Sequence, residues 1–182
     1  MSAVLETERL VLRLPSPEDA AMAAEYIVDP EVMRYIGGET APPEEAPATV
    51  ERWLDRWEQD EIGPFMLERR SDGVVVGRVG FLVWDTRDWH QCTFAEGDAH
   101  AQPELGWTLV RAHWGQGYAT EAAIAVRDWG RRERGIGHLV SLIEPTNTRS
   151  QAVARRLGAE PTETVRLTAH DGVPVVVWVH PA

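Results

Sequence analysis

Cysteine, long apolar runs and targeting signals are scarce in this chain of 182 residues. Its single cysteine, Cys92, excludes an internal disulfide and fits a reducing compartment, and we expect it to be an inert small residue. No apolar run approaches the roughly 20 residues that cross a membrane, and the N-terminal residues lack the layout of a signal peptide. The expectation is a cytoplasmic protein without a membrane partner.

Basic residues are outnumbered, with 18 Lys and Arg against 29 Asp and Glu and a net charge of −11. This balance disfavours non-specific binding to nucleic acid and to anionic membranes. It is compatible with a cationic or amine acceptor, although acidity also serves solubility. The length and the ordinary apolar fraction of 43% predict a single domain over residues 1–182.

Residue periodicity and turn chemistry predict the order β-α-α-β-β-β-α-β-α-β-β. This order lacks the strict alternation of a doubly wound fold, so it predicts an α/β fold with a mixed, mainly antiparallel sheet of about seven strands and helices on both faces. Residues 39–47 read as a mobile loop or helix lead-in, and residues 85–102 as a long polar loop. Predicted strands are 9–14, 65–70, 74–84, 104–110, 138–143, 163–168 and 173–179. The four predicted helices are 17–28, 50–57, 119–134 and 147–157, and a short further piece starts at Asp29-Pro30 and ends at Gly37-Gly38.

The most informative segment is His-Trp-Gly-Gln-Gly-Tyr-Ala-Thr-Glu-Ala at residues 113–122, between the strand 104–110 and the helix 119–134. Its glycines allow a sharp turn, and the first N–H groups of a helix have no acceptor inside the helix. The helix dipole adds partial positive charge at that end. The segment therefore predicts a site for a phosphate or pyrophosphate.

The chain resembles the GNAT superfamily of N-acetyltransferases, and within it the RimJ/RimL-like branch that modifies ribosomal-protein N-termini. Three segments carry the resemblance: Thr7-Glu8-Arg9-Leu10-Val11-Leu12-Arg13, the loop Trp114 to Ala122, and Asn147-Thr148-Arg149-Ser150 followed by Arg155-Arg156-Leu157-Gly158. A lone Gly-x-Gly is weak evidence. The nine-residue loop with the second segment about 30 residues later is much more specific.

The resemblance implies that acetyl-CoA is the co-substrate and that no metal takes part. It implies that loop N–H groups hold the CoA pyrophosphate, that strand 104–110 pairs with the pantetheine arm, and that strand 138–143 splays away from it. The cofactor-binding residues implied are Thr108, Leu109, Val110, Gly115, Gln116, Gly117, Tyr118, Ala119, Thr120, Asn147 and Ser150.

The resemblance also implies a direct attack of an amine on the thioester. Glu104 is the expected base, and Ser150 the expected general acid, because Ala154 stands where many family members have a tyrosine. A backbone N–H of Leu109 or Val110 would polarise the thioester carbonyl.

Other interpretations stay open beside these. Glu104 could be a surface carboxylate, Asn147 a helix cap, Ser150 an ordinary first-turn residue, and Trp114 a packing residue. The alternative function is a catalytically weak acyl-CoA-binding module; a Rossmann-type oxidoreductase fits poorly, because its glycine loop follows the first strand.

The acceptor is not specified by the sequence. Its candidate classes are a peptide N-terminus, an amino acid, a polyamine or an antibiotic, and a homodimer is possible. Residues 33–47 and 85–102, which would face the acceptor, are the least family-like parts of the chain. Trp84, Trp89 and His90 would either line an acceptor pocket or pack the second of these segments.

Overall fold

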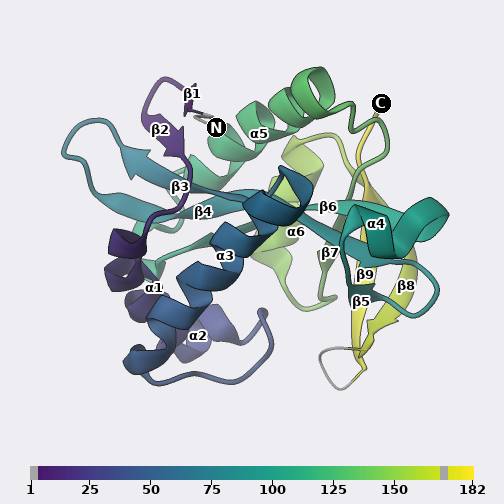
Figure 1. Ribbon diagram of the computed structural model, residues 1–182, viewed down its shortest axis with the longest axis horizontal. Coiled ribbons are helices and arrows are strands. Elements are labelled where there is room, and N and C mark those ends of the chain that lie inside the picture. The colour runs from purple at the N-terminus through teal and green to yellow at the C-terminus, as the bar shows by residue number, and fades with distance from the viewer. Residues whose placement is uncertain (1–3, 169–171) are drawn as a thin grey trace. The chain divides into compact units, whose positions relative to one another are not determined.

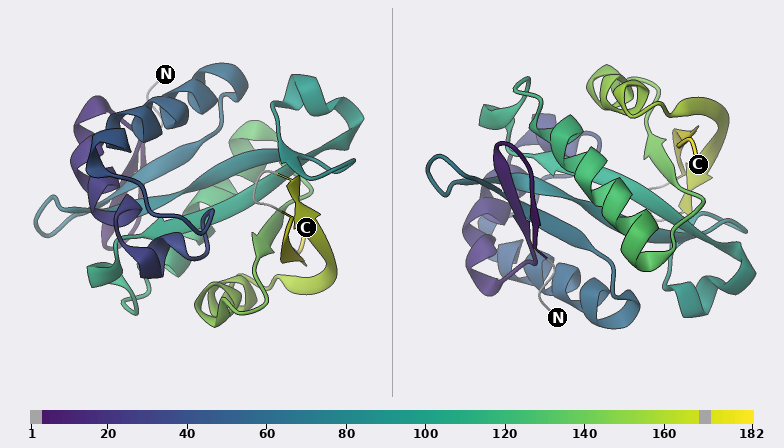
Figure 2. Two further views of the ribbon diagram at one scale, coloured as in Figure 1. Left: turned by 90° about the horizontal axis from the view of Figure 1, so that it is seen from below. Right: turned by 90° about the horizontal axis from the view of Figure 1, so that it is seen from above.

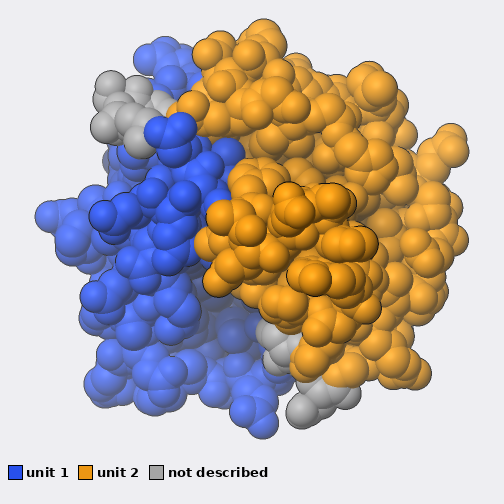
Figure 3. Space-filling view, turned by 45° about the vertical axis from the view of Figure 1, so that its right-hand side comes forward, with its two compact units in different colours: residues 1–80, 107–126 blue, residues 81–106, 127–182 orange. Residues whose placement is uncertain are grey.

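The computed structural model describes residues 4–168 and 172–182. The chain forms two compact units, one of residues 1–80 and 107–126 and the other of residues 81–106 and 127–182 (Figure 3). Three elements run from one unit into the other: β4 (Val75–Asp85), β6 (Ala101–Leu109) and α5 (Tyr118–Arg134). The expectation of a single domain stays a prediction.

The first unit holds strands in the order β1-β2-β3-β4-β6. The strands β1 (Leu5–Glu6), β2 (Leu10–Arg13), β3 (Pro64–Arg69) and β4 pair antiparallel. On one face lie α1 (Ala20–Ile27) and α3 (Ala46–Asp60), and on the other the first part of α5 (Figure 2). Two single-turn helices, η1 (Pro17–Asp19) and η2 (Pro43–Glu45), lead into α1 and α3, and α2 (Pro30–Met33) follows α1.

The core of this unit forms because apolar residues recur at helical spacing on α1 and α3. Val50 and Trp53 of α3 pack with Tyr26 and Ile27 of α1 in one buried cluster that also includes Met66 of β3. On α5 the buried positions include two adjacent alanines, Ala122 and Ala123, whose small side chains allow that part of the helix to lie close to the strands.

The second unit continues the strand order as β4-β6-β7-β9-β8, with β5 (His90–Gln91) beside β4. β7 (Val140–Ile143) is parallel to β6, with Glu104 opposite Val140. β9 (Val173–Val179) pairs antiparallel with both β7 and β8 (Glu160–Leu167). The helix α6 (Thr148–Arg156) follows β7, and its position is seen in Figure 1.

The mixed, mainly antiparallel sheet is confirmed, with nine strands in the described residues rather than about seven. The two extra strands, β1 and β5, are only two residues long, too short to produce a periodic pattern. The splay between the fourth and fifth predicted strands, β6 and β7, stays a prediction. The described residues include no helix that is long and apolar enough to span a membrane.

The long polar loop expected over residues 85–102 is wrong, because this segment holds β5, α4 (Phe94–Gly97), η3 (Asp98–His100) and the start of β6. A capping box begins α4: Thr93 accepts a hydrogen bond from the N–H of Glu96, and the Glu96 carboxylate accepts one from the N–H of Thr93. Thr and Glu at this spacing are a helix-start signal that the sequence contained. The expected turn residues His170 and Asp171 lie outside the described residues.

A buried histidine lies just after β9. The Ser141 hydroxyl donates to the carbonyl of Leu105 at 2.6 Å and lies 3.0 Å from Nε2 of His180, so Nε2 carries the proton that joins the two side chains. Burial and the charges of Arg127 and Arg131 lower the pKa of His180 to about 4. His180 is therefore neutral in the folded protein at neutral pH.

We expect this histidine to make the fold acid-sensitive. The unfolded chain takes up the proton below its ordinary pKa of about 6.5, whereas the folded chain does so only near pH 4, so stability is lost as pH falls through this window. Urea unfolding should show a loss of roughly 2–3 kcal/mol between pH 7 and 4.5 from this group, absent in His180→Gln. His138→Gln, at an exposed position, is the control; equal acid sensitivity in all three proteins would contradict the assignment.

Candidate functional site

The candidate anion-binding site begins where β6 ends. The N–H of Val110 donates to the carbonyl of Val76, which keeps the end of β6 beside β4. At Gly77 the two backbones approach so closely that a Cβ would lie 2.4 Å from the carbonyl oxygen of Thr108. Only glycine fits there, and the close approach fixes the strand from which the glycine loop departs.

The loop itself has the conformation that its glycines predict. A single turn, η4 (Arg111–His113), leads to Gly115 and Gly117, whose φ angles of 75° and 83° lie in the left-handed region. No atom lies within 4 Å of a Cβ built on Gly115. The N–H of Glu121 donates to the carbonyl of Gly117, so the N–H groups before it lie at the open end of α5. The loop conformation is the one expected from the sequence, and its role as an anion-binding site stays a prediction.

A network from the N-terminal strands holds this loop and helix start together. The carboxylate of Glu121 on α5 accepts hydrogen bonds from the Thr7 hydroxyl at 2.6 Å, from the Arg9 backbone N–H at 2.9 Å and from Nε of Arg9 at 2.7 Å. Arg9 also donates to the carbonyl of Gln116 at 2.9 Å, and its guanidinium lies 4.7 Å from the ring centre of Tyr118.

This network explains why two of the motifs occur together. Burial raises the pKa of Glu121, but the hydrogen bonds from Thr7 and Arg9 outweigh it and hold the pKa below its ordinary value. The Glu121 carboxylate is therefore charged and joins the first motif to the loop. The sequence contained all three residues, but their contacts span more than 100 positions, so spacing could not reveal them.

Trp114 is a packing residue, which is the alternative interpretation given above for this member of the loop. Its ring packs against the buried cluster of α1 and α3, and its indole N–H donates to the carbonyl of Leu109 at 2.8 Å. Because the N–H of Val110 is used by Val76, Leu109 is the better of the two candidates for polarising a thioester carbonyl. Strand alternation points the N–H of Leu109 to the opposite side from that of Val110.

Glu104 is not a surface carboxylate. The residue is 7% exposed, its Oε2 accepts a hydrogen bond from the indole N–H of Trp84 at 2.5 Å, and its Oε1 accepts one from the N–H of Leu142 at 3.3 Å. Trp84 is itself 3% exposed and packs against Leu167 and Val175 rather than standing in an open loop. A buried carboxylate with specific donors is the kind of group that active sites use, although ion networks also produce it.

Asn147 caps α6, because its side-chain oxygen accepts a hydrogen bond from the N–H of Ser150 at 3.1 Å. The helix ends as expected at Gly158, whose φ angle is 78°. Ala154 is fully buried on this helix. The second segment therefore has the predicted local structure, and the roles of Asn147 and Ser150 toward a cofactor stay predictions.

The predicted site residues thus lie in both units. Those of the glycine loop and the end of β6 belong to the first unit, whereas Glu104, Asn147 and Ser150 belong to the second. In the first unit, a pocket of about 400 Å³ is lined by Glu8, Arg9, Arg69, Arg70, Ser71 and Tyr118. Its arginines are paired with acids: Arg9 with Glu121, Arg69 with Asp72 and Arg70 with Glu6.

Arg111, which precedes the glycine loop, and His90, in the segment 85–102, each contact an acidic side chain. Arg111 forms an ion pair with Asp29 at 3.0 Å, and the half-buried His90 lies 2.5 Å from Asp88. The hydrogen bond to Asp88 raises the pKa of His90. Within residues 4–168 and 172–182, no group of three or more His, Cys, Asp or Glu is arranged to hold a metal ion.

Comparison with known proteins identifies the family. The profile of the acetyltransferase (GNAT) domain matches residues 9–160, so the chain belongs to the GNAT family. The protein YkkB of Bacillus subtilis (strain 168) is 29% identical over 167 residues, which are 89% of this chain and 88% of YkkB.

Solved structures have the same fold. The crystal structure of an acetyltransferase from Agrobacterium tumefaciens str. C58 aligns with a TM-score of 0.78 at 28% identity, covering 99% of this chain and 95% of the other. RimL, a ribosomal L7/L12 alpha-N-protein acetyltransferase solved in complex with coenzyme A, aligns with a TM-score of 0.75 at 14% identity over 98% and 97% of the two chains.

We expect Glu121→Ala to destabilise the protein by about 1.5–3 kcal/mol, because it removes the charged acceptor shared by Thr7 and Arg9. Urea unfolding at pH 7 measures this change. Glu51→Ala, which removes an exposed carboxylate from α3, is the matched control and should change stability by less than about 0.5 kcal/mol. Equal effects of the two substitutions would show that the network does not stabilise the helix start.

Proposed function

We propose that this protein is an acetyl-CoA-dependent N-acetyltransferase that transfers an acetyl group to a primary amine by direct attack. The observation that carries the proposal is the glycine loop between β6 and α5, which presents an open helix N-terminus and is held in place by Arg9 and Glu121. Membership of the GNAT family supports the same chemistry.

In this proposal the CoA pyrophosphate binds the N–H groups at the start of α5, because they lack acceptors within the helix and lie at the positive end of its dipole. The pantetheine arm pairs with the backbone at the end of β6. Asn147 and Ser150 supply the second cofactor segment. The loop contributors are Gly115, Gln116, Gly117, Tyr118, Ala119 and Thr120, and the strand contributors are Thr108, Leu109 and Val110.

Glu104 is the proposed base. The amine attacks only when neutral, and its proton passes to the carboxylate directly or through one water. A bond forms between the amine nitrogen and the acetyl carbon as the carbon–sulfur bond breaks. An α-amino group, with a pKa of about 7.7–8.0, needs less help than a lysine amine of about 10.4.

Ser150 is the proposed proton donor to the departing thiolate, and its hydroxyl regains a proton from solvent. A free thiol has a pKa of about 8.5, so the thiolate is a tolerable leaving group and a weak acid is sufficient. The N–H of Leu109 is the proposed donor to the thioester carbonyl, since that of Val110 is bonded to Val76.

One observation favours the second candidate, an acyl-CoA-binding module with little turnover. Ala154 is fully buried, so the position where many family members have a tyrosine offers neither a hydroxyl nor space for one without repacking. Such a module would bind CoA through the same loop and release no thiol.

Incubation with acetyl-CoA and a panel of amines separates the two functions. The panel contains a peptide with a free N-terminus, an amino acid, spermidine and an aminoglycoside, and free thiol is followed over time. The chain contains no lysine, so lysine self-acetylation cannot mimic turnover. Thiol release with an amine supports the enzyme; CoA binding without release above background supports the module.

Gly117→Glu should weaken CoA binding at least about 10-fold relative to Gly117→Gln, as measured by calorimetry. Both variants strain the same backbone, whose φ angle is 83°, and both place a Cβ about 3.3 Å from the flexible end of Arg9. Only the glutamate sets a negative charge against the pyrophosphate. Equal affinities of the two variants would exclude the loop as the phosphate site.

Glu104→Gln should lower kcat/KM roughly 100-fold at pH 6, with a smaller loss at pH 9, where more of the amine is already neutral. The pH profile of thiol release measures this effect. Glu163→Gln, an exposed carboxylate on β8, is the control and should leave the profile unchanged. An equal loss at every pH would argue that Glu104 is not the base.

A further inference from the structure

The carboxylate of Glu104 is held by donors that the proposed reaction does not itself use. Burial of a charged carboxylate is costly unless hydrogen bonds replace the lost water. Trp84 supplies one such bond to Oε2 at 2.5 Å, and the N–H of Leu142 supplies one to Oε1 at 3.3 Å. The two donors act on different oxygens, so together they restrict rotation of the carboxylate.

Trp84 is well placed to orient a neighbour because its own ring cannot move freely. It lies on β4, opposite Gln91 of β5, and is 3% exposed. Its buried neighbours are Leu167 and Val175, and Leu82, Trp89 and Leu142 pack against this cluster. Leu142 therefore contacts the cluster with its side chain while its backbone N–H binds Glu104.

Trp89, which packs against this cluster, lies in a tightly held turn of residues 85–90. Its φ angle is 56°, a left-handed conformation that is rare for a bulky side chain and persists only where the surroundings enforce it. The carbonyl of Trp89 accepts a hydrogen bond from the N–H of Thr168 at 3.3 Å, and that of Asp88 accepts one from the Thr168 hydroxyl.

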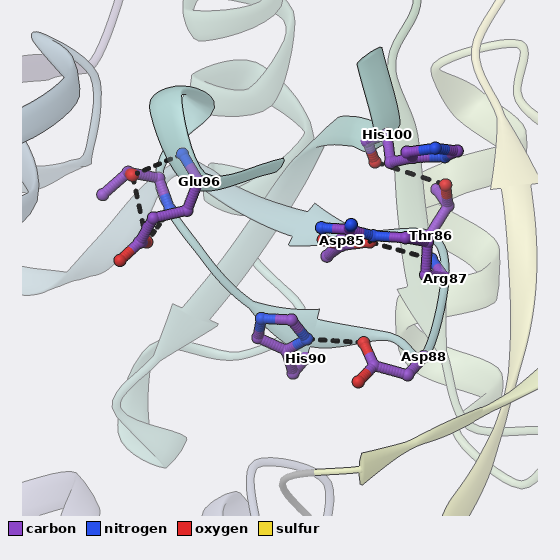
Figure 4. Close-up of polar contacts among 8 residues, drawn as sticks. Asp85, Thr86, Arg87, Asp88, His90, Glu96 and His100 are labelled. Atoms are coloured by element: carbon purple, nitrogen blue, oxygen red, sulfur yellow. Dashed lines mark hydrogen bonds and ion pairs between the residues drawn. The ribbon is translucent and has the colours of Figure 1, made fainter. Parts of the chain in front are cut away.

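Polar contacts among its own side chains also hold this turn (Figure 4). Arg87 binds the Asp85 carboxylate with its guanidinium and its backbone N–H, and these bonds hold the pKa of Asp85 well below its ordinary range. Asp88 faces the imidazole of His90, at 2.5 Å. These contacts keep Trp89 against the Trp84 cluster although its backbone is strained.

We propose that Trp84 is a positioning residue for Glu104: its indole N–H fixes Oε2 and aims the carboxylate in one direction, and the turn 85–90 supports the indole. This inference rests on the proposed function, because it assigns Glu104 the role of base. A hydrogen bond to a charged group favours the charged form, so its loss makes the carboxylate both less ordered and more readily protonated.

The kinetic test compares Trp84→Phe with Trp57→Phe. Both remove an indole N–H from a buried ring, but that of Trp57 donates to the backbone carbonyl of Pro64 at 2.9 Å. With acetyl-CoA and the fastest acceptor of the amine panel, Trp84→Phe should lower kcat/KM roughly 10- to 100-fold and move the acidic limb of its pH profile to higher pH. Trp57→Phe should leave the limb in place. An unshifted limb in Trp84→Phe overturns the proposal.

A double-mutant cycle separates positioning from general damage to the fold. If Trp84 acts through Glu104, Trp84→Phe should cost less than about 2-fold when Glu104 is already glutamine. A full loss in both backgrounds would show a structural role instead. CoA affinity should stay unchanged throughout, because the loop of the first unit is not altered.

The hydrogen bond can also be tested without any acceptor. In ¹H–¹⁵N spectra assigned by triple-resonance experiments, Glu104→Gln should move the Trp84 indole proton upfield, because a neutral amide is a weaker acceptor. The Trp57 indole should not move. An unmoved Trp84 resonance refutes the bond. A moved resonance with full turnover of Glu104→Gln refutes the base assignment, so the two failures are distinguishable.

Discussion

The main constraint on this structure lies at the N-terminus of α5, whose first N–H groups have no acceptor within the helix. Unsatisfied N–H groups at the start of α5 are useful for binding an anion only if the glycine loop before them stays in one conformation. Glu121 accepts bonds from Thr7 and Arg9, and Arg9 in turn binds the carbonyl of Gln116. The N-terminal strands thus hold the start of α5 through Glu121 and Gln116, and the first N–H groups of the helix keep no acceptor within it. This loop lies within the part of the chain that matches the acetyltransferase (GNAT) domain.

A second constraint acts at Glu104, whose carboxyl group is buried rather than exposed. Trp84 and the backbone of Leu142 compensate for the water that the carboxylate loses. The tryptophan is in turn packed by residues from β8, β9 and the turn 85–90. A carboxylate buried in this way has a defined direction, which a surface carboxylate lacks.

The elements that the sequence predicted well are those whose signals are local. The hairpin of β3 and β4, the long α5, and α6 between Asn147 and Gly158 follow from periodicity, caps and turn residues. The segment 85–102 differs from the expected loop because its local signals are weak: β5 has two residues and α4 has four. The capping box of Thr93 and Glu96 is a local helix-start signal, but it lies in a segment whose polar composition favours a loop.

By itself, the sequence determined the family and the conformation of the glycine loop, because both follow from contiguous motifs whose signals are local. Only the tertiary structure decided what holds that loop and what holds Glu104. Arg9 meets Glu121 across 112 positions, and Trp84 meets Glu104 across 20. Contacts of this kind depend on strand pairing and helix packing, which place distant residues side by side and which no local spacing encodes.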